Sequence, residues 1–363
     1  MGAYAVSDLE NALPNLAPST RYQGSKRRIL PWLHRIFKGL EFETCLDGFG
    51  GTASVSYLLK LMGKHVAFND YLRANYQTGI AIIENDRTTL DQSDLDFLLG
   101  DNDLEYESFI QDTFKNIYYT SRENAWLDRT TCNIQMLSQL YRGDILRKKR
   151  ALAYHALCQA CLCKRPFNLF HRKNLYLRRG KVDRTFGNKT TWDTDFTALF
   201  IRFAEEASSK VFGNGRKNRA TCKDIAAVRN DGFDLVYLDP PYTRPGEEYA
   251  VDYFGLYHFL EGIADYPNWR TRIDWSTPNR RLKYRGRKIR VVSSEESFRE
   301  LFEQFQDSVI AVSYGHPGSP SVPRIRRLLR RFKPKVEVFK KAHNYSLSNR
   351  NGEGTYEVLI VGR

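Results

Sequence analysis

The alternation of apolar and polar positions divides the chain into strand-like and helix-like segments. Short apolar runs at Thr44–Leu46 and His65–Phe68 flank an amphipathic stretch, Ala53–Met62, with apolar residues at helical spacing. A strand, a helix and a strand in this order predict a parallel sheet covered by helices on both faces, with right-handed crossovers. Apolar runs return near the end of the chain, at 233–238, 309–313, 336–339 and 356–361. We expect the last two to pair as a hairpin at one edge of the sheet.

The middle of the chain has a different pattern. From Ile82 to about Arg219 helical segments alternate with irregular polar stretches, including an acidic run at 91–107 that is typical of a solvated face. We therefore predict an α/β chain with a Rossmann-like domain around a central, mostly parallel sheet, formed by residues 21–81 and 220–363. A mainly helical inserted domain occupies 82–219. Residues 1–20, which are polar with scattered prolines, are expected to form a flexible lead.

The distribution of charged residues predicts a binding partner. The 363 residues are 42% hydrophobic and 27% charged, as in a globular protein, and no apolar run approaches the ~18 residues that a membrane span needs. Of 56 basic residues, 26 fall with only 3 of the 42 acidic ones in the windows Lys164–Arg184, Arg270–Arg290 and Pro323–Lys341. Such clustering predicts a polyanionic partner, because each Lys or Arg set against a phosphate releases condensed counterions. The alternative is that the windows are solvated basic faces.

The cysteines argue against a disulfide-rich protein, and the N-terminal residues argue against a secreted or lipid-anchored one. Six cysteines are too few for a disulfide scaffold. Cys158, Cys161 and Cys163 are close enough to suggest zinc, but the pattern around them indicates a helix, in which Cys is commonly a small buried residue. We predict no metal site. Residues 1–6 resemble neither a signal peptide nor a myristoylation signal, so we expect a cytoplasmic protein.

A glycine-rich turn follows the first predicted strand. The segment Asp47–Gly51 lies between strand and helix, where glycines let the backbone approach a ligand and the helix N-terminus offers free N–H groups. Asp70 closes the next strand, where an acid can accept hydrogen bonds from ribose hydroxyls. Together they indicate a nucleoside-containing cofactor. The alternative is an ordinary turn followed by a surface aspartate that caps a helix.

The segment Asp239-Pro240-Pro241-Tyr242 follows the most apolar strand. The Asp239 carboxylate and the Pro240 carbonyl could accept the two N–H bonds of a planar exocyclic amine, and the two prolines fix the backbone that presents them. Tyr242 could stack on a base flipped out of its helix. This set of groups suits methylation of an exocyclic amine. The alternative, a simple turn, is disfavoured by the position after a buried strand.

These motifs carry a family resemblance. Residues 21–26, 47–51, Asp70 and 239–242, in that order, resemble the Dam-like class of S-adenosylmethionine-dependent DNA adenine-N6 methyltransferases. Weaker similarity covers 222–224, 313–314 and 357–360. The resemblance implies a Rossmann-like methyltransferase domain, an inserted target-recognition domain, S-adenosyl-L-methionine as cofactor and double-stranded DNA as substrate. Gly48 stands where the family usually has Pro before the Phe, and glycine satisfies the same turn.

The resemblance also implies roles for single residues. The N-terminal motif would pack against the cofactor, Asp70 would hold its ribose and Asp224 would lie near its adenine. The full cofactor set is Tyr22, Lys26, Asp47, Phe49, Gly51, Asp70 and Asp224. The catalytic set is Asp239, Pro240 and Tyr242.

Expected DNA contacts come from two places. Arg178 and Arg179 lie in the insertion, in a stretch similar to part of the family's recognition domain. Arg285, Arg287 and Lys288 lie in the second basic window and could form a clamp, or could belong to a disordered basic loop.

We expect a site-specific DNA adenine methyltransferase from a restriction-modification or related prokaryotic or phage DNA-marking system, with a cognate restriction endonuclease as a candidate partner. Two alternatives remain at this point: a methyltransferase acting on exocyclic amines of ribosomal RNA, and an inactive DNA-binding protein with the same fold. The long insertion and the motif at 21–26 favour DNA over RNA. The intact catalytic motif favours an active enzyme.

Overall fold

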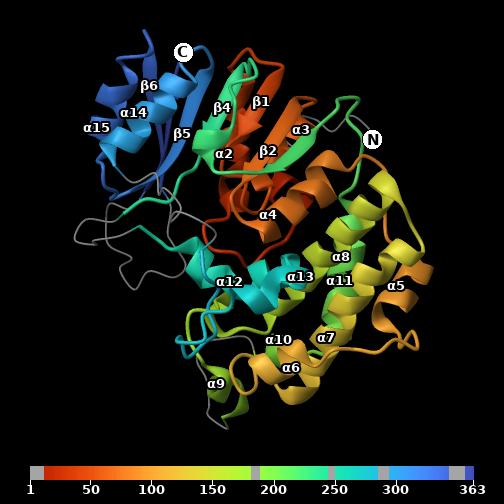
Figure 1. Cartoon of the computed structure of the whole chain (residues 1–363). Coiled ribbons are helices and arrows are strands. Elements are labelled where there is room, and N and C mark those ends of the chain that lie inside the picture. The colour runs from red at the N-terminus through yellow and green to blue at the C-terminus, as the bar shows by residue number, and fades with distance from the viewer. Residues whose placement is uncertain (1–11, 181–188, 244–249, 285–293, 343–355) are drawn as a thin grey trace.

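The computed structural model of the chain describes residues 12–180, 189–243, 250–284, 294–342 and 356–363. Its upper half in Figure 1 is a seven-stranded sheet with strand order β3-β2-β1-β4-β5-β7-β6. The strands are β1 (Thr44–Asp47), β2 (His65–Asp70), β3 (Arg219–Cys222), β4 (Leu235–Leu238), β5 (Val309–His316), β6 (Val336–Ala342) and β7 (Tyr356–Gly362). The α/β class and the Rossmann-like, mostly parallel sheet predicted from the sequence are confirmed.

The pairing of the strands divides the sheet into two parts. Strands β3, β2, β1, β4 and β5 are parallel to one another, whereas β7 is antiparallel to both β5 and β6. The predicted pairing of 336–339 with 356–361 is therefore confirmed. The sequence did not predict β3, an edge strand of only four residues that begins at an exposed arginine.

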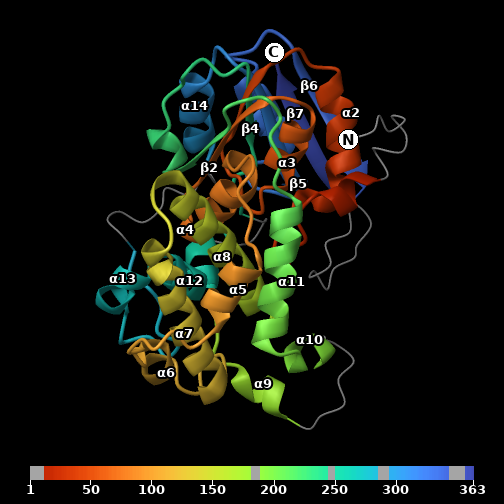
Figure 2. The same cartoon turned by 90° about the vertical axis from the view of Figure 1, so that its right-hand side faces the viewer.

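Helices cover both faces of the sheet. Figure 2 shows α2 (Leu30–Lys38) and α14 (Glu295–Gln304) on opposite sides of it. Alternation along β1 explains how both faces become apolar, because Cys45 belongs to one core and Leu46 to the other. The first core also contains α3 (Ser54–Leu61), and the second also contains α15 (Val322–Leu329).

The lower half of Figure 1 is helical. The chain enters it from β2 through α4 (Arg73–Thr78) and a π-helical turn at Gly79–Glu84. The helices that follow are α5 (Gln92–Leu99), α6 (Phe109–Thr113), α7 (Ser121–Met136), α8 (Gly143–Cys163), α9 (Leu175–Arg179), α10 (Lys189–Asp193) and α11 (Phe196–Ser209). Cys158, Cys161 and Cys163 are buried in α8, as small core residues. In the described ranges no group of His, Cys, Asp and Glu is arranged to hold a metal ion.

Two segments pack in places that the predicted domain ranges did not suggest. Leu13 and Ala17, within the expected flexible lead, are buried in the first core. After β4, α12 (Tyr253–Ala264) and α13 (Tyr266–Trp269) lie against the inserted helices: the Trp269 ring is 5.1 Å from that of Phe114 and 5.4 Å from that of Phe109. Part of the range 220–363 is thus built into the helical half.

Membrane insertion finds no support in these helices. None of those in the described ranges combines the length and the apolarity needed to cross a bilayer.

Trp269 provides a test of this packing. Its side chain is fully buried, so Trp269→Ala should lower the free energy of unfolding by about 3–5 kcal/mol through lost contacts and a cavity. Trp275→Ala is the matched control, because that indole is 55% exposed and its removal should change stability by less than about 0.5 kcal/mol. Denaturant unfolding of both variants measures the difference. Equal stabilities would contradict the packing of α13.

Candidate active site

Three predicted site residues meet at one edge of the sheet. Asp47 ends β1, Asp70 ends β2 and Asp239 directly follows β4. Because β1 pairs in parallel with both β2 and β4, the carboxyl ends of these strands lie side by side. The sheet therefore brings together three carboxylates that are far apart in sequence. Ligands bind at this edge in open α/β sheets.

A buried lysine sits at the centre of the site. The Nζ of Lys26 lies 3.1 Å from Oδ1 of Asp239 and 3.2 Å from Oε1 of Glu357. Lys26 and Glu357 are 9% and 2% exposed. This double ion pair connects the N-terminal motif, the end of β4 and strand β7. A lysine expected only to pack against a cofactor thus contacts Asp239, the predicted catalytic aspartate, directly.

Burial and charge set the ionisation of this pair. Burial disfavours an ammonium ion, but Asp239 and Glu357 hold the pKa of Lys26 well above its usual value. Burial raises the pKa of Asp239 to about 6, with Lys26 lowering it and Glu357 raising it. Asp239 is therefore ionised at neutral pH and becomes protonated below about pH 6.

Asp70 holds two backbone segments in place. Its Oδ2 accepts a hydrogen bond from the N–H of Gly51 at 2.7 Å, and its Oδ1 accepts one from Leu72 at 2.7 Å. Gly51 has φ +50°, a conformation that favours glycine. Burial raises the pKa of Asp70 to about 6, although these donors lower it.

Asp47 carries a buried oxygen with no partner. Its Oδ2 accepts a 2.6 Å hydrogen bond from Ser56, whereas Oδ1 is buried and has no hydrogen-bond partner among the described residues. Burial raises its pKa to about 7, opposed by Ser56 and reinforced by Asp239 and Asp70. An unsatisfied buried carboxylate oxygen is costly in the protein alone and would be compensated by a donor from a ligand.

Aromatic rings line the same region. The Tyr22 ring is stacked on Tyr257 of α12 at 4.1 Å between centroids, and its hydroxyl accepts from Asn75 of α4 at 3.3 Å. Phe49 packs against the second core. Tyr242 lies against Tyr314 of β5, with ring centroids 4.8 Å apart. Pro240 follows Asp239 directly, so its carbonyl is presented from the same turn.

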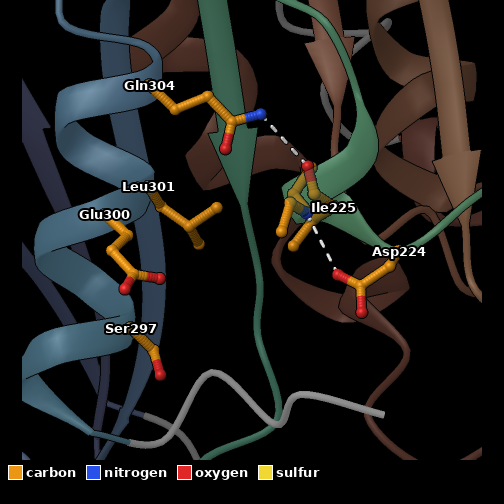
Figure 3. A pocket seen from close by; sticks show the side chains of 7 residues that line it. Asp224, Ile225, Ser297, Glu300, Leu301 and Gln304 are labelled. Atoms are coloured by element: carbon orange, nitrogen blue, oxygen red, sulfur yellow. Dashed lines mark hydrogen bonds between the residues drawn. The ribbon is translucent and has the colours of Figure 1, made fainter. Parts of the chain in front are cut away.

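Asp224 lies beside a cavity on the second face of the sheet. Its carboxylate accepts a 3.0 Å hydrogen bond from the N–H of Ala226 and so caps a short 3-10 helix after β3. The cavity of about 300 Å³ lies between this turn and α14, as Figure 3 shows. Its lining residues are Asp224, Ile225, Ala226, Ser297, Glu300, Leu301 and Gln304.

The predicted DNA contacts have different surroundings. Arg178 donates to both carboxylate oxygens of Glu123, at 2.6 and 3.0 Å, and its side chain is 8% exposed. Its guanidinium is therefore used within the helical half. Arg179 is exposed. Arg285, Arg287 and Lys288 lie outside the described residues.

Three residues of the site were not among the predicted ones. Glu357 pairs with Lys26, and its charge within an otherwise apolar strand was the available signal. Asn69 donates to the carbonyls of Gly48 and Lys223, so it joins the turns after β1 and β3. Glu261 of α12 accepts from the first two N–H groups of α4, at 3.0 and 2.9 Å. The sequence pattern around Asn69 and Glu261 contains no comparable signal.

Comparison with known proteins identifies a family for this chain. The model of the family D12 class N6 adenine-specific DNA methyltransferase matches residues 22–313. The chain is 25% identical over 350 residues to the Type II methyltransferase M2.HphI of Haemophilus parahaemolyticus, which covers 94% of this chain and 96% of that protein. It is 24% identical over 367 residues to the modification methylase LlaI of Lactococcus lactis subsp. lactis, across 94% of this chain. Only 54% of the LlaI methylase is covered, so the chain spans about half the length of that relative.

The double ion pair predicts opposite shifts in the pKa of Asp239 when the charge of Lys26 or of Glu357 is removed. Lys26→Met removes the cation that stabilises ionised Asp239, so the pKa of Asp239 should rise above about 6. Glu357→Gln removes a neighbouring negative charge and should lower it. Lys26→Arg is the control that retains the charge. NMR titration of isotope-labelled aspartate carboxyls, assigned with Asp239→Asn, would measure each value. An unchanged midpoint in both Lys26→Met and Glu357→Gln would contradict the assigned contacts.

Proposed function

Since the chain belongs to the D12 class N6 adenine-specific DNA methyltransferase family, it is a DNA adenine methyltransferase, and we propose that Asp239 and the carbonyl of Pro240 bind the reacting adenine amine. The observation that carries this proposal is the ion pair of Lys26 with Asp239 at the carboxyl end of β4. Lys26 lies against Oδ1 of Asp239. Oδ2 is the oxygen that we assign to the amine.

We propose S-adenosyl-L-methionine as the methyl donor that this family requires. Asp47 and Asp70 end neighbouring strands beside Asp239, and Lys26 is paired with Asp239 and Glu357. Carboxyl groups gathered at this edge of the sheet suit a cationic ligand. The unsatisfied Oδ1 of Asp47 supports the same fit. Bound there, the cofactor would supply an electrophilic methyl group on a positively charged sulfur.

The other proposed cofactor contacts come from the loops that follow the strands and from the N-terminal motif. Asp70 would accept from the ribose hydroxyls, and Asp224 would bind the cofactor adenine from the rim of its cavity. Tyr22 and Phe49 would pack against the ligand, and Gly51 would allow the backbone to approach it. In this arrangement the hydrogen bond from the Gly51 N–H to Asp70 is retained.

The protein contributes to the reaction by orienting the adenine amine and by stabilising the charge that develops on it. The lone pair of an adenine amine is delocalised into the ring, so the amine is a weak nucleophile. Two acceptors fixed at Asp239 and Pro240 favour the pyramidal form of the amine that can attack. Positive charge then develops on that nitrogen, and ionised Asp239 stabilises it before a proton leaves to solvent. Lys26 acts by holding Asp239 in this orientation.

The target adenine must leave the duplex to reach this site. We propose that Tyr242, braced by Tyr314, stacks on the flipped base. Arg179 from α9 and Arg285, Arg287 and Lys288 from the second basic window are the proposed phosphate contacts.

The names of the relatives suggest the biological setting. One is a Type II methyltransferase and the other a modification methylase. We propose that this chain likewise marks sites in a restriction-modification system of a bacterium or phage, alongside a cognate restriction endonuclease. The family description specifies DNA, which disfavours the ribosomal RNA alternative.

Cofactor affinity tests the assignment of Asp70. Asp70→Ala should raise the dissociation constant for S-adenosylmethionine roughly tenfold or more, because a hydrogen bond to a charged group contributes about 1.5–3 kcal/mol. Asp70→Asn, which preserves shape and one acceptor, separates the loss of charge from collapse of the Gly51 turn. Asp101→Ala, on an exposed residue, is the control. Calorimetry of folded protein provides the measurement, and unchanged affinity in both Asp70 variants would remove Asp70 from the site.

Methyl transfer tests the catalytic motif and the function. Tritium transfer from labelled cofactor to unmodified duplex DNA should fall by on the order of a hundredfold or more in Asp239→Ala, while DNA affinity changes little. Tyr242→Ala should weaken base capture by roughly 1–3 kcal/mol, and Tyr242→Phe should be mild. Near-parental transfer by folded Asp239→Ala would overturn the mechanism. Preferential labelling of ribosomal RNA would overturn the substrate.

A further inference from the structure

A tryptophan outside the active site is presented to solvent by a short loop. Trp275 is 55% exposed. It lies between Ile273 and Leu282, which form an isolated antiparallel bridge and are both buried. The guanidinium of Arg280 lies over the indole, 5.1 Å from the ring centroid. Exposure of one large apolar side chain is ordinary by itself, and what distinguishes Trp275 is the way in which its loop is held.

Hydrogen bonds within the loop fix its shape. The N–H of Asp274 donates to the carbonyl of Arg281 at 2.7 Å, and that of Lys283 donates to the carbonyl of Arg272 at 2.7 Å. Thr277 closes the turn, because its hydroxyl donates to the Asp274 carbonyl and accepts from the Arg281 N–H, each at 2.8 Å. Arg280 donates to the carbonyl of Trp275 at 2.8 Å. The indole is therefore carried by a closed, bonded turn.

The base of the loop is hydrogen-bonded to a buried hub, which consists of Tyr118, Arg165 and Phe170. Asn279 is 4% exposed, and its amide donates to the carbonyl of Phe170 at 3.0 Å. The hydroxyl of Tyr118 contacts the carbonyls of both Phe170 and Asn279, at 2.6 and 3.1 Å. Arg165, 1% exposed, lies over the Tyr118 ring and donates to Asn174. The hub thus joins the loop to the segment that leads into α9.

The segments that meet at this hub are basic and expose aromatic rings. Residues 167–180 contain four basic and no acidic residues, and 274–284 contain three basic and one acidic. Tyr176 of α9 is 69% exposed. The carboxylate of Asp274 is used within the loop, by the N–H and hydroxyl of Ser276. Positive charge with interleaved aromatic rings is the combination that binds the backbone and bases of nucleic acids.

The loop is also connected to the active site. Arg281 donates to Asp252 at 2.6 Å, and Asp252 caps the first turn of α12. The next residue, Tyr253, is stacked with Tyr22 of the cofactor motif at 5.9 Å between centroids. A continuous chain of contacts thus joins the loop to the N-terminal motif of the candidate active site.

We propose that Trp275 is a DNA-binding residue that stacks on a base outside the catalytic pocket, with Arg280 as its support. The proposal rests on the proposed function, since it assumes that duplex DNA is opened at the target. Every unstacked base exposes a π-face, whatever its identity. The contact therefore stabilises the opened duplex without specifying a base.

Tryptophan fluorescence gives a direct test. The other four tryptophans, Trp32, Trp126, Trp192 and Trp269, are buried or half-buried. Titration of the parent protein with duplex DNA that carries its mapped methylation site should quench the fluorescence of Trp275. The quench should be largely lost in Trp275→Phe, a variant that can still stack and should bind DNA with nearly parental affinity. A quench of equal size in Trp275→Phe would overturn the proposal.

Affinity gives the second readout. Trp275→Ala should weaken binding of the same duplex roughly tenfold, as for loss of one stacking contact. Leu140→Ala, which truncates another exposed apolar residue, is the matched control and should bind as the parent does. Parental affinity in Trp275→Ala would overturn the stacking role alone. A parent protein that bound no duplex DNA would overturn the proposed function, and this inference with it.

Discussion

The arrangement of this protein depends on one buried ammonium group. Lys26 and Glu357 are 331 positions apart in the chain, and Asp239 lies between them. A charge removed from water is costly unless it is paired, so both carboxylates stabilise Lys26 in this position. These ion pairs connect the N-terminal motif, the end of β4 and β7.

A second set of contacts connects the sheet with the helical half. Glu261, near the C-terminal end of α12, accepts from the first N–H groups of α4, which begins three residues after Asp70. Burial raises the pKa of Glu261 to about 7, although these two donors lower it. Tyr257 of the same helix stacks on Tyr22. One helix therefore contacts both the segment after Asp70 and the N-terminal motif.

The sequence predicted those features that depend on residues close to one another in the chain. Apolar runs identified β1, β2, β4 and the β6–β7 pair because a buried strand needs apolar residues, and glycines marked the turn after β1 because Gly51 adopts positive φ. Long-range pairing was not readable. Arg178 looked like a phosphate contact until its partner Glu123 was known, and Arg165 belongs to a basic window yet is 1% exposed. Counting charges in a window measures composition, whereas exposure depends on packing between distant segments. The four-residue strand β3 was missed for a similar reason, since its polar sequence is stabilised by pairing with β2.

The position of β7 has a consequence for synthesis of the protein. Strand β7 lies between β5 and β6, although it follows both in the chain, and it carries Glu357. While the ribosome is still making the chain, β5 and β6 have no strand between them and Lys26 lacks one of its two carboxylates. The sheet and the site are therefore completed by the same late event. A chain that ends before residue 356 lacks both the strand that pairs with β5 and β6 and the Glu357 carboxylate that pairs with Lys26.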